Sequence, residues 1–201
     1  MDKRIEQVIV GSIQTNCWLY LLDNEPNGKQ PCVVIDPGDN APKITASLQS
    51  LGWIPRYILL THGHWDHVTA LPDMLEAFAK NAFGSKELPE VYIHRLDANR
   101  LKKDDNPIHH FEDGDTIGPF KVLHTPGHTQ GSCCFYDEKK RVLFSGDTLF
   151  EGDHGRTDLP GGDAEQMRKS LKRLVSLDEK TVVYPGHDIT TTIAAEKHKY
   201  W

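Results

Sequence analysis

The sequence predicts an α/β protein, and three observations carry this prediction. Short runs rich in β-branched and aromatic residues recur along the whole chain, as is typical of strands. Between several of them lie segments whose apolar residues repeat at the spacing of an amphipathic helix. Four of the strand-like runs end directly in potential metal ligands, and loops at strand ends are where α/β scaffolds commonly build active sites.

Composition limits the class of protein. A chain of 201 residues with 38% hydrophobic and 26% charged residues resembles an ordinary globular protein, and we expect residues 1–201 to form a single domain. No apolar run approaches the length that spans a membrane, and the start of the chain lacks the features of a secretory signal, so we expect a cytoplasmic protein. A net charge of −6 without a basic block argues against nucleic acid and favours a small-molecule substrate.

The first third of the chain reads as strands followed by a helix and another strand. β-rich runs separated by turn residues predict a meander. A helix with apolar residues at helical spacing and a closing glycine follows, and then a buried strand. The predicted strands are 5–10, 17–22, 31–36 and 56–60, and the predicted helix is 41–52.

The rest of the chain continues the alternation. Residues 68–80 have a helical period despite Pro72, and a second helix with Asp163 as N-cap is predicted further on. The predicted helices are 68–80 and 163–177, and the predicted strands are 90–94, 116–125, 131–137, 141–147 and 181–188. Residues 146–162 show no element, and a loop of that length in a compact domain is usually functional or disordered.

The four cysteines do not form a recognisable framework. Cys17, Cys32, Cys133 and Cys134 have no C-x-x-C spacing, and the vicinal pair lies in a strand-like run, where neighbouring side chains point to opposite faces. We therefore expect reduced thiols in the core.

The stretch "THGHWDH", residues 61–67, concentrates potential metal ligands. It holds three histidines and one aspartate directly after the apolar run "YILL". At this chain's own frequencies the pattern would arise by chance in about three of a thousand such sequences, so coincidence explains it poorly.

Three later segments follow the same plan. "KVLHTPGH", "VLFSGD" and "VVYPGH" each end a β-like run with a potential ligand after a glycine. Taken alone, each of these later residues is best interpreted as structural, as a core histidine, a turn former or a loop side chain. Their repetition together with the cluster indicates a shared site. The candidate ligands are His62, His64, Asp66, His67, His128, Asp147 and His187.

Seven ligands exceed the needs of one ion. A catalytic zinc takes three protein ligands and keeps one position open, whereas two ions need six or seven including a bridge. His62 and His64 are two residues apart and lean to the same side in an extended loop, so they can hold one ion together. Asp66 and His67 diverge from that pair and suit a second ion.

The ordered motifs "THGHWDH", "PGHTQGS", "SGDTLF" and "YPGHD" resemble the signature of the metallo-β-lactamase fold superfamily, and "GRTDLPGGD" and "TTTIAAEKH" resemble its glyoxalase II-like branch. This resemblance implies an αββα four-layer sandwich of two mixed β-sheets flanked by helices, with the site at one sheet edge. It implies that His62, His64 and His128 hold one ion, that Asp66, His67 and His187 hold a second, and that Asp147 bridges them. Glyoxalase II proper carries a C-terminal helical extension that binds glutathione, which we do not expect here because the chain ends at Trp201.

The expected chemistry is hydrolysis of a thioester, as in hydroxyacylglutathione hydrolase, or of a related activated ester. Two cations sharing a water lower its pKa and polarise the substrate carbonyl, so no serine or cysteine nucleophile is required. Asp66 is the candidate catalytic residue that orients the nucleophile and carries a proton to the leaving group. Zinc is the expected metal, and iron or manganese also suits histidine and carboxylate ligands.

Other functions are compatible with the same residues. Persulfide dioxygenases, which use one iron and molecular oxygen, resemble this chain in a G-R-T-D segment like 155–158. A lactonase or a non-catalytic metal-binding module is a weaker alternative. A complete set of ligands argues against the non-catalytic module.

Each of three further residues could have either of two roles. Arg156 and Asp158 are expected to form a partly buried ion pair that locks the long loop, and the alternative is contact with an anionic substrate. Asp36 in "VIDPG" is expected to hydrogen-bond a metal ligand, and the alternative is a turn former.

Overall fold

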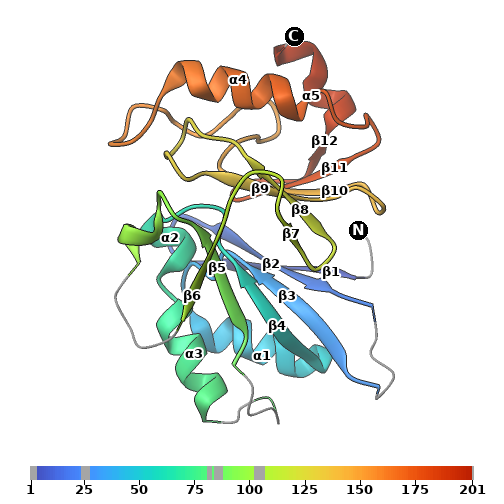
Figure 1. Ribbon diagram of the computed structural model, residues 1–201. Helices are drawn as coiled ribbons and strands as arrows, with labels where there is room; N and C mark the ends of the chain where they lie inside the picture. Colours follow the sequence, from blue (N-terminus) through green and yellow to red (C-terminus); the bar gives the residue numbers. More distant parts are fainter. Residues whose placement is uncertain (1–3, 24–27, 81–82, 84–87, 102–106, 201) are drawn as a thin grey trace. The chain divides into compact units, whose positions relative to one another are not determined.

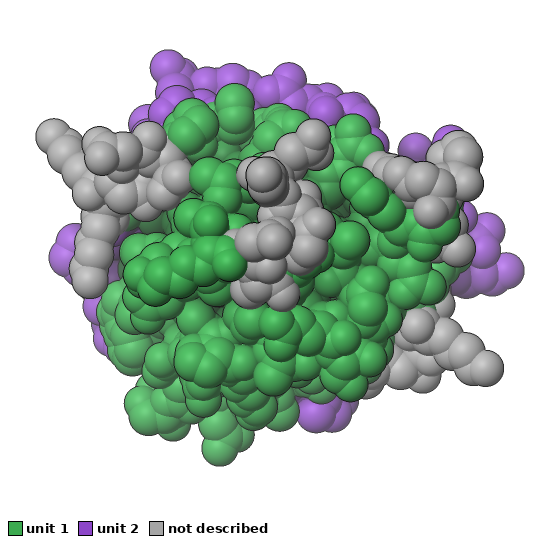
Figure 2. Space-filling model, turned by 90° about the horizontal axis from the view of Figure 1, so that it is seen from below, with its two compact units in different colours: residues 1–60, 64–92, 101–109 green, residues 61–63, 93–100, 110–201 purple. Residues whose placement is uncertain are grey.

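The computed structural model describes residues 4–23, 28–80, 83, 88–101 and 107–200. The chain divides into two compact units, which Figure 2 colours separately. Unit 1 comprises 1–60, 64–92 and 101–109, and unit 2 comprises 61–63, 93–100 and 110–201.

The first sheet has six strands in the order β1-β2-β3-β4-β5-β6 (Figure 1). Strands β1 to β3 form the predicted antiparallel meander, whereas β4 runs parallel to both β3 and β5. The sheet is therefore mixed. Its strands are β1 (Ile5–Val10), β2 (Thr15–Leu21), β3 (Gln30–Ile35), β4 (Trp53–Leu59), β5 (Glu90–His94) and β6 (Ile108–Phe111).

Helices α1 (Ala41–Leu51) and α3 (Leu71–Ala79) lie side by side on one face of this sheet (Figure 1). Both bury an apolar stripe at helical spacing, which in α1 is formed by Ile44 and Leu48. The helix predicted over 68–80 begins later, at Leu71, so that Pro72 falls in the first turn, where its missing N–H is not needed. A separate single turn, α2 (Trp65–Val68), precedes it.

The second sheet also has six strands, in the order β12-β11-β10-β9-β8-β7. Strands β10 and β11 are parallel, and the other pairs are antiparallel. Its strands are β7 (Thr116–Ile117), β8 (Phe120–His124), β9 (Cys133–Asp137), β10 (Val142–Gly146), β11 (Val182–Pro185) and β12 (Thr191–Thr192).

Helices α4 (Ala164–Leu174) and α5 (Ile193–Tyr200) cover one face of the second sheet (Figure 1). Asp163 is the N-cap of α4, as predicted, and its carboxylate accepts from the backbone N–H of Gln166 at 2.9 Å. Met167 and Leu171 of α4 pack into one core cluster with Leu143 and Val183 of the sheet. This cluster holds the helix on the strands that lead to Asp147 and His187.

Several short elements were not predicted from the pattern of residues. Strands β6 and β12, helix α5 and the single 3-10 turn η1 (Ala98–Arg100) are too short or too polar to show a clear period. The expected thiols are confirmed, because all four cysteines are free and buried. Within the described part of the chain, no helix has both the length and the hydropathy needed to cross a membrane.

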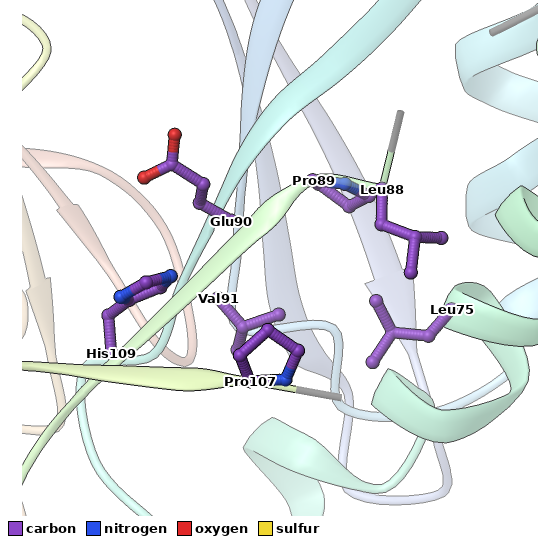
Figure 3. Close-up of a pocket in the computed structure, with 7 residues that line it drawn as sticks. All are labelled: Leu75, Leu88, Pro89, Glu90, Val91, Pro107 and His109. Atoms are coloured by element: carbon purple, nitrogen blue, oxygen red, sulfur yellow. The ribbon is translucent and has the colours of Figure 1, made fainter. Parts of the chain in front are cut away.

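Unit 1 has a small hollow between α3 and the strands β5 and β6 (Figure 3). Leu75, Val91 and Pro107 line it, with Glu90 and His109 at its side, and its volume is about 100 Å³. Pockets that enclose small organic ligands are usually at least about 300 Å³. We therefore do not assign the hollow as the substrate site.

Candidate metal centre

The loop after β4 contains Thr61 and His62, and both are buried. The backbone carbonyl of Thr61 accepts from the N–H of Cys133 at 2.8 Å, which fixes the loop to the start of β9. Nδ1 of His62 lies 3.1 Å from the hydroxyl of Thr61. With one ring nitrogen held in this way, Nε2 is the nitrogen left for a metal ion.

The single helical turn α2 carries Asp66 and His67, and both side chains are buried. Nδ1 of His67 lies 2.9 Å from the Oδ2 atom of Asp36, which is 1% exposed and follows β3. A carboxylate accepts the proton on Nδ1 and so orients Nε2 as the metal-binding atom. Asp36 therefore makes the hydrogen bond predicted for it, and its partner is the candidate ligand His67.

Asp66 is held through one of its carboxylate oxygens. Oδ2 accepts from the hydroxyl of Thr15 at 3.1 Å and lies 3.2 Å from Nε2 of His67. Thr15 begins β2, 51 residues earlier in the chain, so the first hairpin restrains the helical turn.

In unit 2, Asp147 lies next to two of the predicted histidine ligands. Its Oδ2 atom is 3.3 Å from Nε2 of His128 and 3.7 Å from Nε2 of His187. Nδ1 of His128 lies 2.7 Å from the backbone carbonyl of Arg156, which again leaves Nε2 directed to the site. One carboxylate oxygen therefore faces two imidazole nitrogens, an arrangement suited to binding cations.

Gly146 makes the position of Asp147 possible. Its φ of +49° lies in the left-handed region, and a Cβ added there would stand 2.4 Å from the hydroxyl of Thr61. Any side chain at this position would push β10 away from the loop that carries His62.

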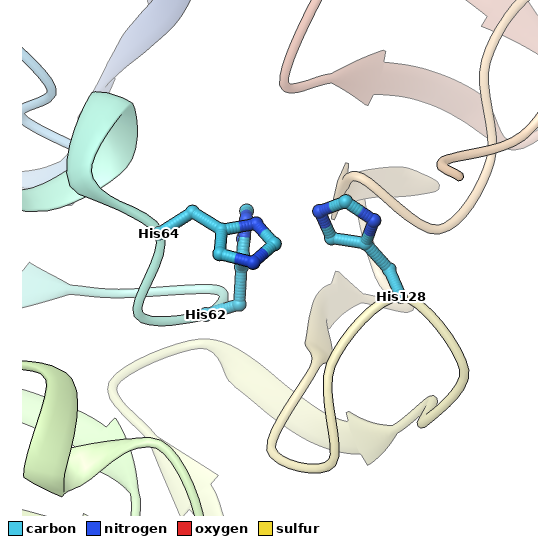
Figure 4. A group of neighbouring side chains, drawn as sticks. All are labelled: His62, His64 and His128. Atoms are coloured by element: carbon cyan, nitrogen blue, oxygen red, sulfur yellow. The ribbon is translucent and has the colours of Figure 1, made fainter. Parts of the chain in front are cut away.

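Donor atoms within 4.8 Å of one another form three groups in the described chain. The first contains the three imidazoles shown in Figure 4. In unit 2, the rings of His62 and His128 meet edge to face, with centroids 4.9 Å apart. The groups are His62, His64 and His128; Asp66, His67 and His187; and Asp36, His62 and His67.

The chemistry of these donors fits divalent metal ions. Imidazole nitrogen and carboxylate oxygen are the ligands of catalytic zinc, iron and manganese sites. Three of the histidines hold their Nδ1 atoms against an oxygen outside the ligand set, as metal-bound histidines usually do. The described residues therefore suit a His/Asp metal site.

The alternative nucleophiles are not poised for reaction. The Ser145 hydroxyl donates to the backbone carbonyl of Leu149 at 2.8 Å and so stabilises a turn. Burial raises the pKa of the Cys133 thiol well above its usual range, with Cys134 as a second cause. A thiol that stays protonated is a poor nucleophile.

Arg156 and Asp158 form the predicted ion pair, but the prediction that it is partly buried is wrong. The guanidinium donates two hydrogen bonds, of 2.8 and 2.7 Å, to the carboxylate. The side chains are 61% and 67% exposed. Because the residues are only two apart, the pair closes within the loop and reaches solvent, and the backbone of Arg156, through its bond to His128, is the part that restrains a predicted ligand.

Two contributors were missed in the sequence. Thr15 holds Asp66, and Asp97 binds the backbone N–H of Gly63 at 2.9 Å. Asp97 follows the strand-like run "EVYIH", so the strand-end signal that revealed the other polar residues was present there too. It was missed because the residue is not preceded by the glycine that marks the later ligands.

Comparison with known proteins places these residues in a family. The profile of the metallo-beta-lactamase superfamily matches residues 10–187. A protein of Haemophilus influenzae named hydroxyacylglutathione hydrolase GloC is 34% identical, over 96% of this chain and 94% of that protein.

Two solved structures are also similar over nearly the whole chain. TTHA1623 in a di-iron-bound form is 39% identical, with a TM-score of 0.81 over 95% of this chain and 96% of that one. ETHE1 from Myxococcus xanthus is 29% identical, with a TM-score of 0.75 over 96% of this chain and 81% of that one. These matches confirm the predicted αββα fold class, two mixed sheets flanked by helices.

Proposed function

Because the chain belongs to the metallo-β-lactamase superfamily, we propose that it is a metal-dependent hydrolase of small thioesters. The observation that carries the proposal is the carboxylate of Asp147, whose Oδ2 faces one histidine from each predicted ion site, His128 at 3.3 Å and His187 at 3.7 Å. A bridging ligand must be near both ions, and this geometry supports that role.

The proposed assignment uses all seven candidate ligands. The groups of neighbouring donor atoms support it, because two of the three groups coincide with the triads that the resemblance implies. The first ion is assigned to His62, His64 and His128, the second to Asp66, His67 and His187, and Asp147 bridges them. Zinc is the expected metal, and the di-iron form of TTHA1623 makes iron the principal alternative.

When bound, such ions lower the pKa of water towards neutrality and polarise a carbonyl. The protein's own contribution is orientation. Thr15 fixes Oδ2 of Asp66, so this carboxylate presents a constant direction to the reacting centre. Asp66 then holds the attacking water and transfers its proton to the leaving thiolate.

A glutathione thioester is the proposed substrate class. Support comes from the protein named hydroxyacylglutathione hydrolase GloC, to which this chain is 34% identical over 94% of that protein's length. A chelator should abolish turnover.

The test combines metal analysis with two substrates. About two ions per chain and hydrolysis of S-lactoylglutathione support the proposal. A truncated thioester with the same acyl group reports how much the glutathione part contributes, since lost remote binding raises KM or lowers kcat. One iron per chain, with oxygen uptake on glutathione persulfide and no thioester hydrolysis, would replace the proposal with sulfur oxidation.

Two variants test the ligand assignment. Asp147→Ala removes the proposed bridge and should deplete both ions, whereas His187→Ala should deplete mainly one. Equal partial losses in the two variants would contradict the bridge.

A further inference from the structure

Asp97 is a buried carboxylate that the proposed ligand set does not use. It is the last residue of the turn 95–97, which leads from β5 into η1, and it is 1% exposed. The nearest cation that the described structure pairs with it is Arg100, whose Nε lies 3.8 Å from Oδ1. A carboxylate is seldom buried this deeply unless hydrogen bonds offset its desolvation.

Three donors from two loops converge on this carboxylate. Oδ2 accepts from the backbone N–H of Gly63 at 2.9 Å and from the hydroxyl of Thr129 at 2.7 Å. Oδ1 accepts from the backbone N–H of Gly131 at 3.1 Å. Gly63 lies between His62 and His64 in the chain, and Thr129 directly follows His128, so each loop that Asp97 holds carries a proposed ligand of the first ion.

Gly63 and Gly131 lie so close to residues 97–100 that no residue with a side chain would fit at either position. A Cβ at Gly131 would stand 2.7 Å from Cγ of Asp97, and a Cβ at Gly63 would stand 2.8 Å from the Cβ of Arg100 and 2.9 Å from the carbonyl oxygen of Asp97. The backbone of both loops is therefore pressed against residues 97–100. Because both loops contact the same short segment, the position of Asp97 restrains the distance between them.

We propose that Asp97 is a positioning residue for the metal centre, which sets the distance between the 62–64 loop and the His128 loop so that they bind one ion together. The inference rests on the proposed function only in taking these histidines as ligands. Asp97 does not touch the ion in this proposal and acts through Gly63, Thr129 and Gly131.

The charge of the carboxylate matters as well as its shape. All three partners donate, and an ionised carboxylate is the side chain that only accepts. An asparagine would direct its NH2 group towards at least one of these donors. Asp97→Asn thus keeps the volume of the side chain and breaks the pattern of acceptors.

Asp137→Asn is the matched control. Asp137 is also buried, at 2%, belongs to the same unit, and lies at the far end of β9, where its carboxylate accepts from the backbone N–H of Lys140. Both variants exchange one oxygen for an NH2 group at a buried aspartate. Only Asp97→Asn changes a contact with the ligand-bearing loops.

The measurements are the affinities of the two sites for Zn²⁺, from competition with a chromophoric chelator, and the visible spectrum of the Co²⁺-substituted protein. We expect Asp97→Asn to weaken one site about 10- to 100-fold, the range for changes in groups that orient metal ligands, and to leave the other within about threefold. The Co²⁺ bands should shift. Asp137→Asn should retain the wild-type affinities and spectrum.

Urea unfolding of the metal-free proteins separates this role from general stability. If Asp97→Asn and Asp137→Asn lose metal affinity only in proportion to lost stability, or if Asp97→Asn keeps both affinities and the spectrum, the inference is wrong. If Asp97→Asn fails to fold, Thr129→Val takes its place, because this variant removes one donor and leaves the carboxylate. A lower Zn²⁺ affinity at one site in Thr129→Val would support the inference. Wild-type Zn²⁺ affinity at both sites would overturn it. Since no readout requires turnover, absent thioesterase activity in the wild type would refute the proposed function and not this inference.

Discussion

Replacing Asp36 separates the orientation of His67 from the folding of the loop that carries it. Asp36 has a φ of +53°, so an alanine there would combine two effects, the lost acceptor and the strain of a left-handed conformation. Asp36→Gly removes the hydrogen-bond acceptor, and glycine adopts a positive φ without strain. Asp36→Asn keeps an oxygen acceptor and a residue type that tolerates this conformation, and is therefore its control.

The magnitude follows from one buried hydrogen bond. Nδ1 of His67 and Oδ2 of Asp36 are 2.9 Å apart, with side chains 0% and 2% exposed. Without the acceptor, the imidazole can move its proton to Nε2, the nitrogen proposed to bind the ion. Loss of such a partner typically weakens metal binding about 10- to 100-fold, or about 1.4 to 2.7 kcal/mol.

The assay is chelator competition on purified protein, with urea unfolding of the metal-free form beside it. Asp36→Gly should lose affinity at one site only, and Asp36→Asn should remain within about tenfold of the wild type because it still accepts the proton on Nδ1. Equal affinities for Asp36→Gly and the wild type would refute the claim that this hydrogen bond selects the metal-binding nitrogen.

Three further predictions concern residues of unit 2. Glu196→Gln should lower the free energy of urea unfolding by about 1 to 3 kcal/mol, because its buried carboxylate accepts from Thr191 and from the backbone of Gly152, and an unchanged value would contradict this. Gly127→Ala should cost roughly 3 kcal/mol or more on the same assay, because its Cβ would stand 2.4 Å from the backbone of α4; a loss below 1 kcal/mol would count against the packing described. The hydrogen bonds from Arg156 hold the pKa of Asp158 at about 2, so that this exposed pair is lost as the pH falls through that value; Arg156→Gln should return the pKa towards about 3.9 in an NMR titration, and an unshifted value would show that the pair is absent in solution.

Helices and strands could be predicted from the sequence where the residues that define them lie close together in the chain. The N-cap of α4 depends on Asp163 and a residue three positions later, and the stripe of α1 on a repeat within eleven residues. Both the N-cap and the apolar stripe could therefore be predicted from the sequence alone. The bounds of the helix predicted over 68–80 shifted to Leu71 because the pattern does not say in which turn Pro72 falls.

The sequence by itself also determined which side chains are able to bind a metal, because histidine and aspartate at strand ends are visible without a structure. Only the tertiary structure decided how they are restrained. The hydrogen bonds that His67 makes to Asp36 and that the backbone N–H of Gly63 donates to Asp97 join residues 31 and 34 positions apart. The exposure of Arg156 depends on what packs around its loop. No local pattern encodes such contacts, since they arise only when the sheet brings distant strand ends to one edge.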